Sequence, residues 1–199
     1  MLILLRRSVV FAVVMMAGTL VYAFIGTGVA QLFFKNQANG SITANGSTLI
    51  GQNWKSPAFF HGRPDDAGPY AANAAKHISG GDNPLVANGV PGSSGATNLG
   101  PRSKVLLNNT RALVAYWHSM GVNPTPDLVT TSGSGYDPDI SPADATAEIP
   151  MVAKATGIAP GTLATLIKKE THGPQFGFLG ASYIDVLQLN EALVALEHR

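Results

Sequence analysis

The strongest candidate for a binding or catalytic role is one polar run, SGSGYDPD, at residues 132–139. Serine hydroxyls alternate there with glycines, whose backbone can turn sharply. The run is a poor match to a phosphate-binding loop, because no Lys follows it as that motif requires. Three interpretations are open: a turn shaped by its glycines, a surface that docks another protein chain, or carbonyl groups that steer a cation. The candidate binding residues are Ser132, Gly133, Ser134, Gly135, Asp137, Pro138 and Asp139.

Serine hydrolysis is a second possibility. The stretch GSSGA at residues 92–96 approximates a nucleophile elbow around Ser94. An elbow needs a strand before it and a helix after it, and this stretch lies in a sequence rich in Gly, Asn and Ser. A flexible turn is the better interpretation, and a membrane-anchored hydrolase using Ser94 or Ser134 is kept as an alternative.

Metal-binding chemistry has little support in the sequence. The histidines lack the spacing of helical zinc ligands, and without cysteine there are no thiolate sites or disulfides. Four acidic residues between 137 and 148 lack the spacing of a calcium loop, so a cation-attracting surface is a minor alternative and no metal site is expected. The histidines are His61, His77, His118, His172 and His198, and the acidic residues are Asp137, Asp139, Asp144 and Glu148.

An apolar stretch from Ser8 to Phe34 carries no charged residue. As a helix it exceeds the roughly 20 residues that a bilayer requires, and it is longer than the apolar region of a cleaved signal peptide. Gly28–Ala30 could serve as a cleavage site, but we predict a retained transmembrane helix over residues 8–34. Arg6 and Arg7 precede it and Lys35 follows, so the positive-inside rule puts residues 1–7 in the cytoplasm.

The rest of the chain is predicted to form one domain outside the cytoplasm. Residues 35–47 are polar and rich in turn formers, as in a linker, and residues 48–199 are long enough for a single core. Beyond residue 35 the chain has 10 basic and 12 acidic residues. This nearly neutral balance argues against a nucleic-acid partner.

Mixed helical and strand patterns predict a compact α+β domain. We expect strands at residues 48–52, with Leu49 and Ile50 in the core, at 127–131 and at 183–187. An aromatic cluster of Trp54, Phe59 and Phe60 is expected to pack in the core.

Helices are predicted from their caps and apolar spacing. One begins at Pro101 and ends before Gly121. Ser141, Pro142 and Asp144 form a capping box for another, which meets Pro150 and stops at Gly157. Further helices are expected from near Pro160, at residues 191–197 with Asn190 as cap, and over two turns at residues 71–77.

The run from Asp127 to Pro142 (DLVTTSGSGYDPDISP) resembles the C subunit of the bacterial potassium-transporting Kdp ATPase. Further motifs match in the same order, and the N-terminal span matches too, so the resemblance covers nearly the whole chain. Residues 65–66, 94–97 and the long loop at 78–93 depart from the family pattern. The other matching motifs are Gly46–Gln52, Phe59–Pro64, Asn98–Pro101 and Asp185–Asn190.

The resemblance implies a bacterial inner-membrane complex with a potassium-pore subunit, a P-type ATPase subunit and a very small single-span subunit. This chain would be a non-catalytic accessory subunit, with ATP, Mg²⁺ and K⁺ used by the complex. The resemblance also implies an effect on the ATP affinity of the pump subunit through a glutamine, for which Gln52 is the candidate by motif. The predicted topology puts Gln52 outside, away from cytosolic ATP, so we expect the domain to pack over the pore entrance instead. A membrane-tethered periplasmic solute-binding domain is the alternative function.

Overall fold

The structure is a computed structural model that describes residues 1–52, 54, 56–64 and 99–197. The expected helix at 71–77, the long loop at 78–93, Ser94, His77 and His198 lie outside the described residues. The chain divides into two compact units, Met1–Ile42 and Thr43–Arg199, which are described separately.

The N-terminal unit consists of a long helix, α1 (Leu2–Phe33), and a short one, α2 (Lys35–Ala38). Within the described part of the chain, α1 is the one helix long and apolar enough to cross a membrane. It has a mean hydropathy of 2.3 in its most apolar window, and none of its residues is buried in the protein. A helix satisfies its own backbone groups, as lipid requires. Thr19 supports this by donating its hydroxyl to the carbonyl oxygen of Met15 at 2.8 Å.

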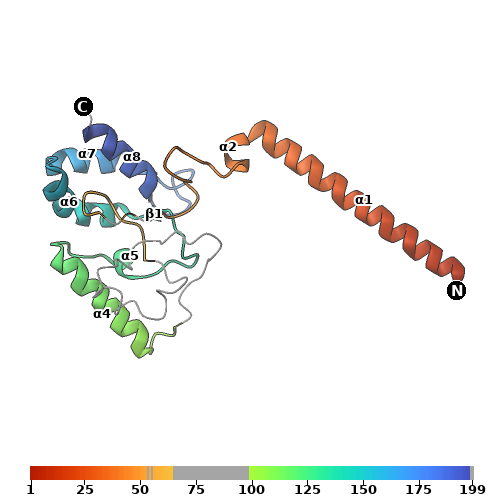
Figure 1. The fold of residues 1–199 in the computed structure, drawn as a ribbon, viewed down its shortest axis with the longest axis horizontal. Helices are drawn as coiled ribbons and strands as arrows, with labels where there is room; N and C mark the ends of the chain where they lie inside the picture. Colours follow the sequence, from red (N-terminus) through yellow and green to blue (C-terminus); the bar gives the residue numbers. More distant parts are fainter. Residues whose placement is uncertain (53, 55, 65–98, 198–199) are drawn as a thin grey trace. The chain divides into compact units, whose positions relative to one another are not determined.

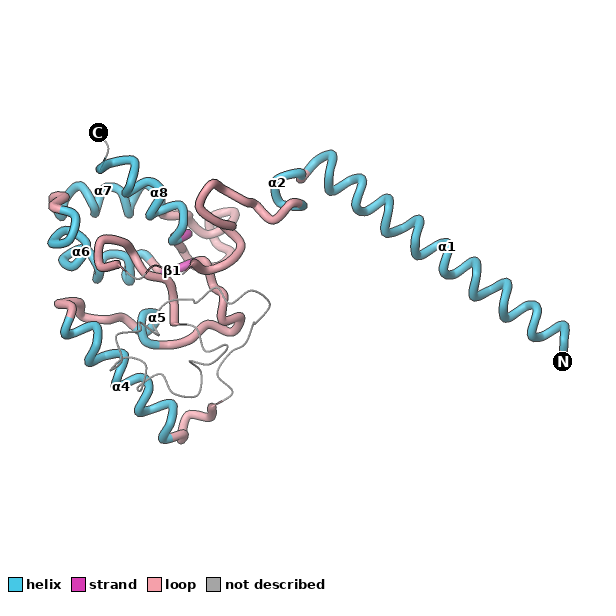
Figure 2. Tube along the Cα trace, in the orientation of Figure 1, coloured by secondary structure: helices cyan, strands magenta, loops and turns pink. Residues whose placement is uncertain are grey.

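The second unit is mainly helical with a small sheet (Figures 1 and 2). Its described elements are α4 (Lys104–Ser119), α5 (Pro126–Val129), β1 (Asp139–Ile140), α6 (Pro142–Thr156), α7 (Pro160–Glu170), β2 (Ile184–Asp185) and α8 (Val186–Glu197). In the view of Figure 1, α6, α7 and α8 pack together on one side, and α4 and α5 lie on the other. The antiparallel pair β1–β2 places Asp139 opposite Asp185 and Ile140 opposite Ile184.

Local sequence rules locate α6 and α7 correctly. The side chain of Ser141 accepts from the backbone N–H of Asp144, and the side chain of Asp144 accepts from that of Ser141, which completes the predicted capping box. α6 continues through the exposed Pro150 and ends at Gly157, whose φ of 76° fits a left-handed cap. α7 begins at Pro160 as predicted.

The start of α4 was predicted three residues too early. Its cap is Ser103, whose hydroxyl accepts from the backbone N–H of Leu106, whereas Pro101 lies in the preceding turn. The predicted end before Gly121 is confirmed. Leu113 and Trp117 are buried, so the expected amphipathic spacing marks the packed face correctly.

Two predicted strands are wrong. Pro126 takes the first position of the short helix α5, so the β-branched run behind it does not extend from residue 127. Residues 48–52 form turns, and Leu49 and Ile50 are 55% and 43% exposed rather than in the core.

The C-terminal segment also differs from expectation. The strand at 183–187 shrinks to Ile184–Asp185, because Asp185 caps α8 by accepting from the backbone N–H of Gln188 at 2.8 Å. Asn190 is therefore inside the helix, and its buried amide bonds to both backbone groups of Phe60 at 2.9 Å. The expected aromatic packing is confirmed: Phe60 is fully buried, and the rings of Trp54 and Phe59 lie 4.8 Å apart.

Candidate functional site

The run predicted from sequence forms an ordered loop between α5 and β1, here called the Ser132–Asp139 loop. The hydroxyl of Ser132 accepts from the backbone N–H of Gly135 at 3.0 Å and lies 3.2 Å from that of Ser134. Gly135 has a φ of 72°, as the turn interpretation requires, whereas Gly133 is not among the residues with positive φ. Ser132 and Gly135 are buried, and Gly133 and Ser134 are exposed. The loop therefore presents its tip to the surface on a fixed base.

Arg63 lies beneath this loop and ties it to the aromatic segment. Its Nη1 approaches Oδ2 of Asp137 at 3.5 Å, and its Nη2 donates to the carbonyl oxygen of Thr131 at 3.2 Å. The same nitrogen lies 3.9 Å from Oδ1 of Asp127. A planar guanidinium can serve several acceptors in a fixed geometry. Arg63 thus links the residues that precede the loop to Asp137 within it.

Gln52, the candidate glutamine, lies beside the same loop. The backbone N–H of Gly51 donates to the carbonyl oxygen of Tyr136 at 2.7 Å. The Gln52 amide donates to the carbonyl oxygens of Ile50 at 3.1 Å and Ser47 at 3.3 Å. The two motifs that the sequence singled out are therefore neighbours, and the amide of Gln52 is engaged by its own turn.

Two carboxylates lie close together where the loop ends in β1. Asp139 faces Asp185 across the β1–β2 pair. Burial, followed by the charges of Asp137 and Asp185, raises the pKa of Asp139 to about 6. Burial also raises the pKa of Asp185, although the backbone N–H groups of Gln188 and Leu187 oppose it. The expected acidic surface is therefore half-buried here, and its charge depends on pH near neutrality.

The other two members of that acidic set do not lie on the surface. Asp144 and Glu148 are both fully buried, so the minor alternative of a cation-attracting surface does not hold for them. Burial is the main cause that raises the pKa of Asp144 to about 7, and its neighbour Asp127 adds to it. Desolvation of a carboxylate favours its neutral form. The side chain of Asp144 is occupied by the cap of α6, so its role is structural.

Sequence reasoning missed a buried pair, His61 and Glu148. Nδ1 of His61 lies 2.7 Å from Oε2 of Glu148, and the backbone N–H of His61 donates to both carboxylate oxygens at 3.2 Å. The imidazole meets the ring of Trp117 edge-on at 5.3 Å. Burial raises the pKa of Glu148, and the contacts from His61 oppose this. The two residues are 87 positions apart, so no spacing rule could have found them.

Among the residues that the structure describes, neither a general base for a serine nor a metal site lies at the loop. The hydroxyl of Ser134 lies beside that of Ser132, which cannot act as the general base that activates a serine. Among the described residues, no group of three His, Asp or Glu side chains is placed to hold a metal ion. The loop thus offers hydroxyl groups, carboxylates and backbone groups for binding.

Comparison with known proteins identifies the family. A family model described as "KdpC: K+-transporting ATPase, c chain" matches residues 4–195. The chain belongs to the KdpC family. A potassium-transporting ATPase KdpC subunit of Paraburkholderia phytofirmans is 38% identical over 199 residues, covering 96% of this chain and 95% of the relative. KdpC subunits of Gloeobacter violaceus and Rhodopseudomonas palustris are 39% and 40% identical, covering 87% and 94% of this chain and 86% and 94% of their own lengths.

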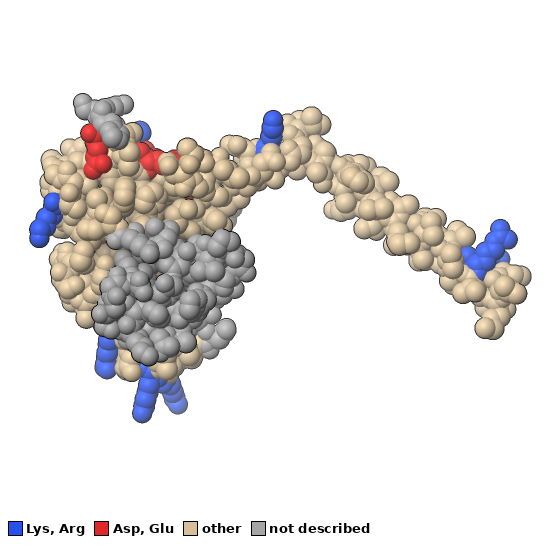
Figure 3. Space-filling model, in the orientation of Figure 1, with Lys and Arg blue, Asp and Glu red and all other residues tan. Residues whose placement is uncertain are grey.

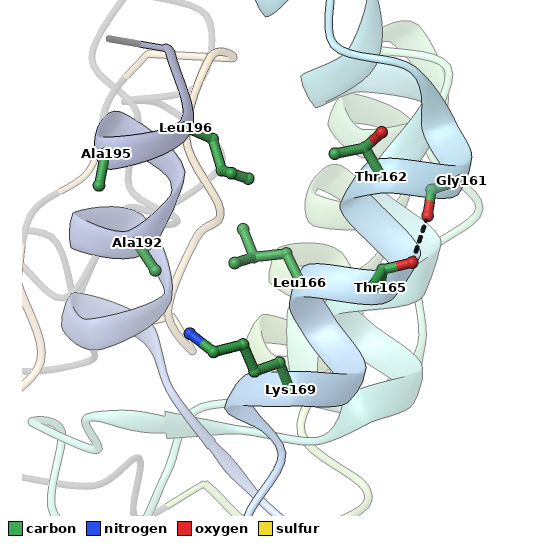
Figure 4. Close-up of a pocket in the computed structure, with 8 residues that line it drawn as sticks. All are labelled: Gly161, Thr162, Thr165, Leu166, Lys169, Ala192, Ala195 and Leu196. Atoms are coloured by element: carbon green, nitrogen blue, oxygen red, sulfur yellow. Dashed lines mark hydrogen bonds between the residues drawn. The ribbon is translucent and has the colours of Figure 1, made fainter. Parts of the chain in front are cut away.

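This KdpC-family domain also has a groove of about 730 Å³ between α7 and α8 (Figure 4). Leu166, Leu196 and alanines of α8 line it. Two of its polar groups are already paired, since Thr165 donates to the carbonyl oxygen of Gly161 at 2.9 Å and Lys169 lies 3.1 Å from Glu170. A solute-binding site needs polar groups that converge on the ligand. The groove therefore gives little support to the solute-binding alternative.

Proposed function

We propose that this KdpC-family chain is a non-catalytic subunit of an ATP-driven potassium uptake pump. Its family supports this, because the relatives are named as potassium-transporting ATPase subunits. Its partners would be the potassium-pore subunit, the P-type ATPase subunit and the small single-span subunit. ATP, Mg²⁺ and K⁺ would be used by the assembled complex, and none of them is assigned to this chain.

The observation that carries the docking role is the shape of the Ser132–Asp139 loop. Its tip at Gly133 and Ser134 is exposed, while hydrogen bonds from Arg63 and Gly51 fix its base. A surface that is already ordered loses little conformational freedom when a partner binds. We assign this loop to the contact with the pore subunit, with Asp137, Pro138 and Asp139 at its edge near the potassium entrance.

The proposed topology follows the sequence expectations. Residues 1–7 lie in the cytoplasm, residues 8–34 cross the bacterial inner membrane, residues 35–47 form the linker and residues 48–199 form the periplasmic domain. The apolar character of α1 and the basic pair before it support this arrangement. In this topology Gln52 cannot meet cytosolic ATP, and its amide serves its own turn. Any influence on ATP affinity would act through the assembly.

The test is co-purification of the tagged full chain from mild detergent, with bound proteins identified by mass spectrometry. A polytopic pore protein together with a P-type ATPase is the expected result. Ser134→Trp, which adds bulk at the exposed tip, should weaken that recovery, and Thr162→Trp on the exposed side of α7 is the matched control. A solitary chain, in detergent that preserves a known complex, would overturn the proposal and favour a tethered solute-binding domain.

A further inference from the structure

Charge is strongly segregated within the domain. Between Leu99 and Pro126 the sequence holds the basic residues Arg102, Lys104 and Arg111 and no Asp or Glu. Residues 127–197 instead contain nine acidic and three basic residues. Figure 3 shows a group of Lys and Arg side chains at the lower edge of the domain, where Figure 1 places α4, and acidic side chains at the opposite edge.

Two basic side chains share one face of α4 with an exposed leucine. Lys104, Leu107 and Arg111 are three and four positions apart, so they lie on one face of the helix. All three are exposed, and Leu107 has 47% of its surface in contact with solvent. The core does not need Leu107, because Leu113 and Trp117 on the other side of α4 supply its apolar contacts.

An exposed leucine between cations matches the chemistry of a membrane surface. The apolar group enters the boundary between headgroups and acyl chains, and the cations meet lipid phosphates. We propose that this surface, the α4 basic face (Arg102 in the preceding turn, with Lys104, Leu107 and Arg111), binds anionic phospholipid headgroups of the membrane that α1 spans. The proposal rests on the membrane anchorage in the proposed function and adds a second membrane contact to it.

The expected strength is adequate because the domain is tethered. Each Lys or Arg near an anionic lipid surface improves binding by on the order of fivefold. Three cations would hold a free domain only weakly, but attachment through α1 makes the second contact intramolecular. An acidic protein partner would satisfy the cations and leave Leu107 without a matching surface, so the lipid is favoured.

The absence of native cysteine allows a direct test on the full chain in nanodiscs. An environment-sensitive fluorophore is placed on Asn108→Cys, an exposed position on α4, or on Thr162→Cys, an exposed control on α7. The discs contain nitroxide-labelled lipid as quencher in either phosphatidylglycerol–phosphatidylcholine mixtures or phosphatidylcholine only. We expect the Asn108 label to be quenched several-fold more in the anionic discs and the Thr162 label to differ little.

Charge variants decide whether the cations cause the effect. R102Q/K104Q/R111Q should reduce quenching in anionic discs to the phosphatidylcholine level, while the charge-preserving R102K/R111K should retain it. Equal quenching in both lipids, or no effect of the glutamine variant, overturns the proposal. So does an Asn108 label whose quenching in the assembled complex is insensitive to lipid composition. If the chain does not insert into the discs, the membrane anchorage in the proposed function has failed instead.

Discussion

Nδ1 of His61 lies 2.7 Å from a carboxylate oxygen of Glu148 inside the domain, and both side chains are almost fully buried. The backbone N–H of His61 adds two further contacts to the same carboxylate. The pair therefore connects the segment around His61 to the middle of α6. Arg63, in the same segment, contacts the Ser132–Asp139 loop.

Removal of one partner should destabilise the fold strongly. His61→Ala leaves Glu148 buried without its imidazole partner, which costs about 3–5 kcal/mol. Urea unfolding of the full chain in detergent, followed by tryptophan fluorescence, measures this, since Trp117 lies beside His61. His118→Ala, at an exposed position on α4, is the control and should change stability by less than about 1 kcal/mol. Equal effects of the two substitutions would contradict the structural role of the pair.

Asn190→Ala should weaken the attachment of α8 to the aromatic segment. The substitution removes two hydrogen bonds and leaves the backbone N–H and carbonyl group of Phe60 buried and unpaired. Each such group costs about 1–3 kcal/mol. Asn108→Ala, on the exposed side of α4, is the matched control. Loss of less than about 1 kcal/mol in the same unfolding experiment would show that the Phe60 segment finds other partners.

The Asp139–Asp185 pair should make stability depend on pH. The pKa of Asp139 rises from 3.8 to about 6 in the folded protein. Between these values the folded state binds the proton that the unfolded state has lost, so stability falls as pH rises from about 4 to 6. Asp139→Asn should therefore gain about 1 kcal/mol at pH 8, a figure reduced for partial exposure, and nothing below pH 4. Glu197→Gln is the exposed control, and an equal effect at both pH values would contradict a raised pKa of Asp139, which burial causes first and the charges of Asp137 and Asp185 increase.

Gln52→Ala should affect stability and leave nucleotide kinetics unchanged. The amide bonds to two carbonyl oxygens of its own turn, so its loss should cost about 1 kcal/mol. The KM for ATP of the reconstituted pump should equal that of the unaltered complex, as should that of the exposed control Gln37→Ala. A raised KM for Gln52→Ala with normal assembly would contradict the proposed topology.

The topology has its own test, which again uses the cysteine-free chain. Ser134→Cys should react with a membrane-impermeant maleimide in cells whose outer membrane has been opened. Leu2→Cys should react only after the inner membrane is broken. The reverse pattern would place the domain in the cytoplasm.

The elements that were predicted correctly from the sequence are those whose signals are local. The capping box of α6 and the proline at the start of α7 depend on residues within one helical turn, and both are confirmed. The strand predicted from residue 127 was wrong because β-branched side chains are common in strands, while Pro126 in fact starts a helix. At this place the helix start that Pro126 stabilises outweighs the strand propensity of the β-branched residues.

The candidate site likewise contains residues that local sequence signals identify and residues that they do not. The Ser132–Asp139 loop was identifiable because Ser, Gly and Asp shape turns through their own backbone contacts. Arg63 and the His61–Glu148 pair were not identifiable, since their partners lie far along the chain. Asn190 was taken for a cap because its side chain suits one, whereas tertiary contact with Phe60 determines its place.

The contact between Phe60 and Asn190 also determines when the domain can be completed during synthesis. The two residues are separated by 130 positions, which a ribosome takes on the order of ten seconds to translate. Until α8 has emerged, the aromatic segment lacks the amide that pairs its backbone, and contacts of such long range are slow to form. The growing polypeptide therefore stays without its finished core until α8 has been translated, a state that suits the transfer of the domain across a membrane in the proposed topology.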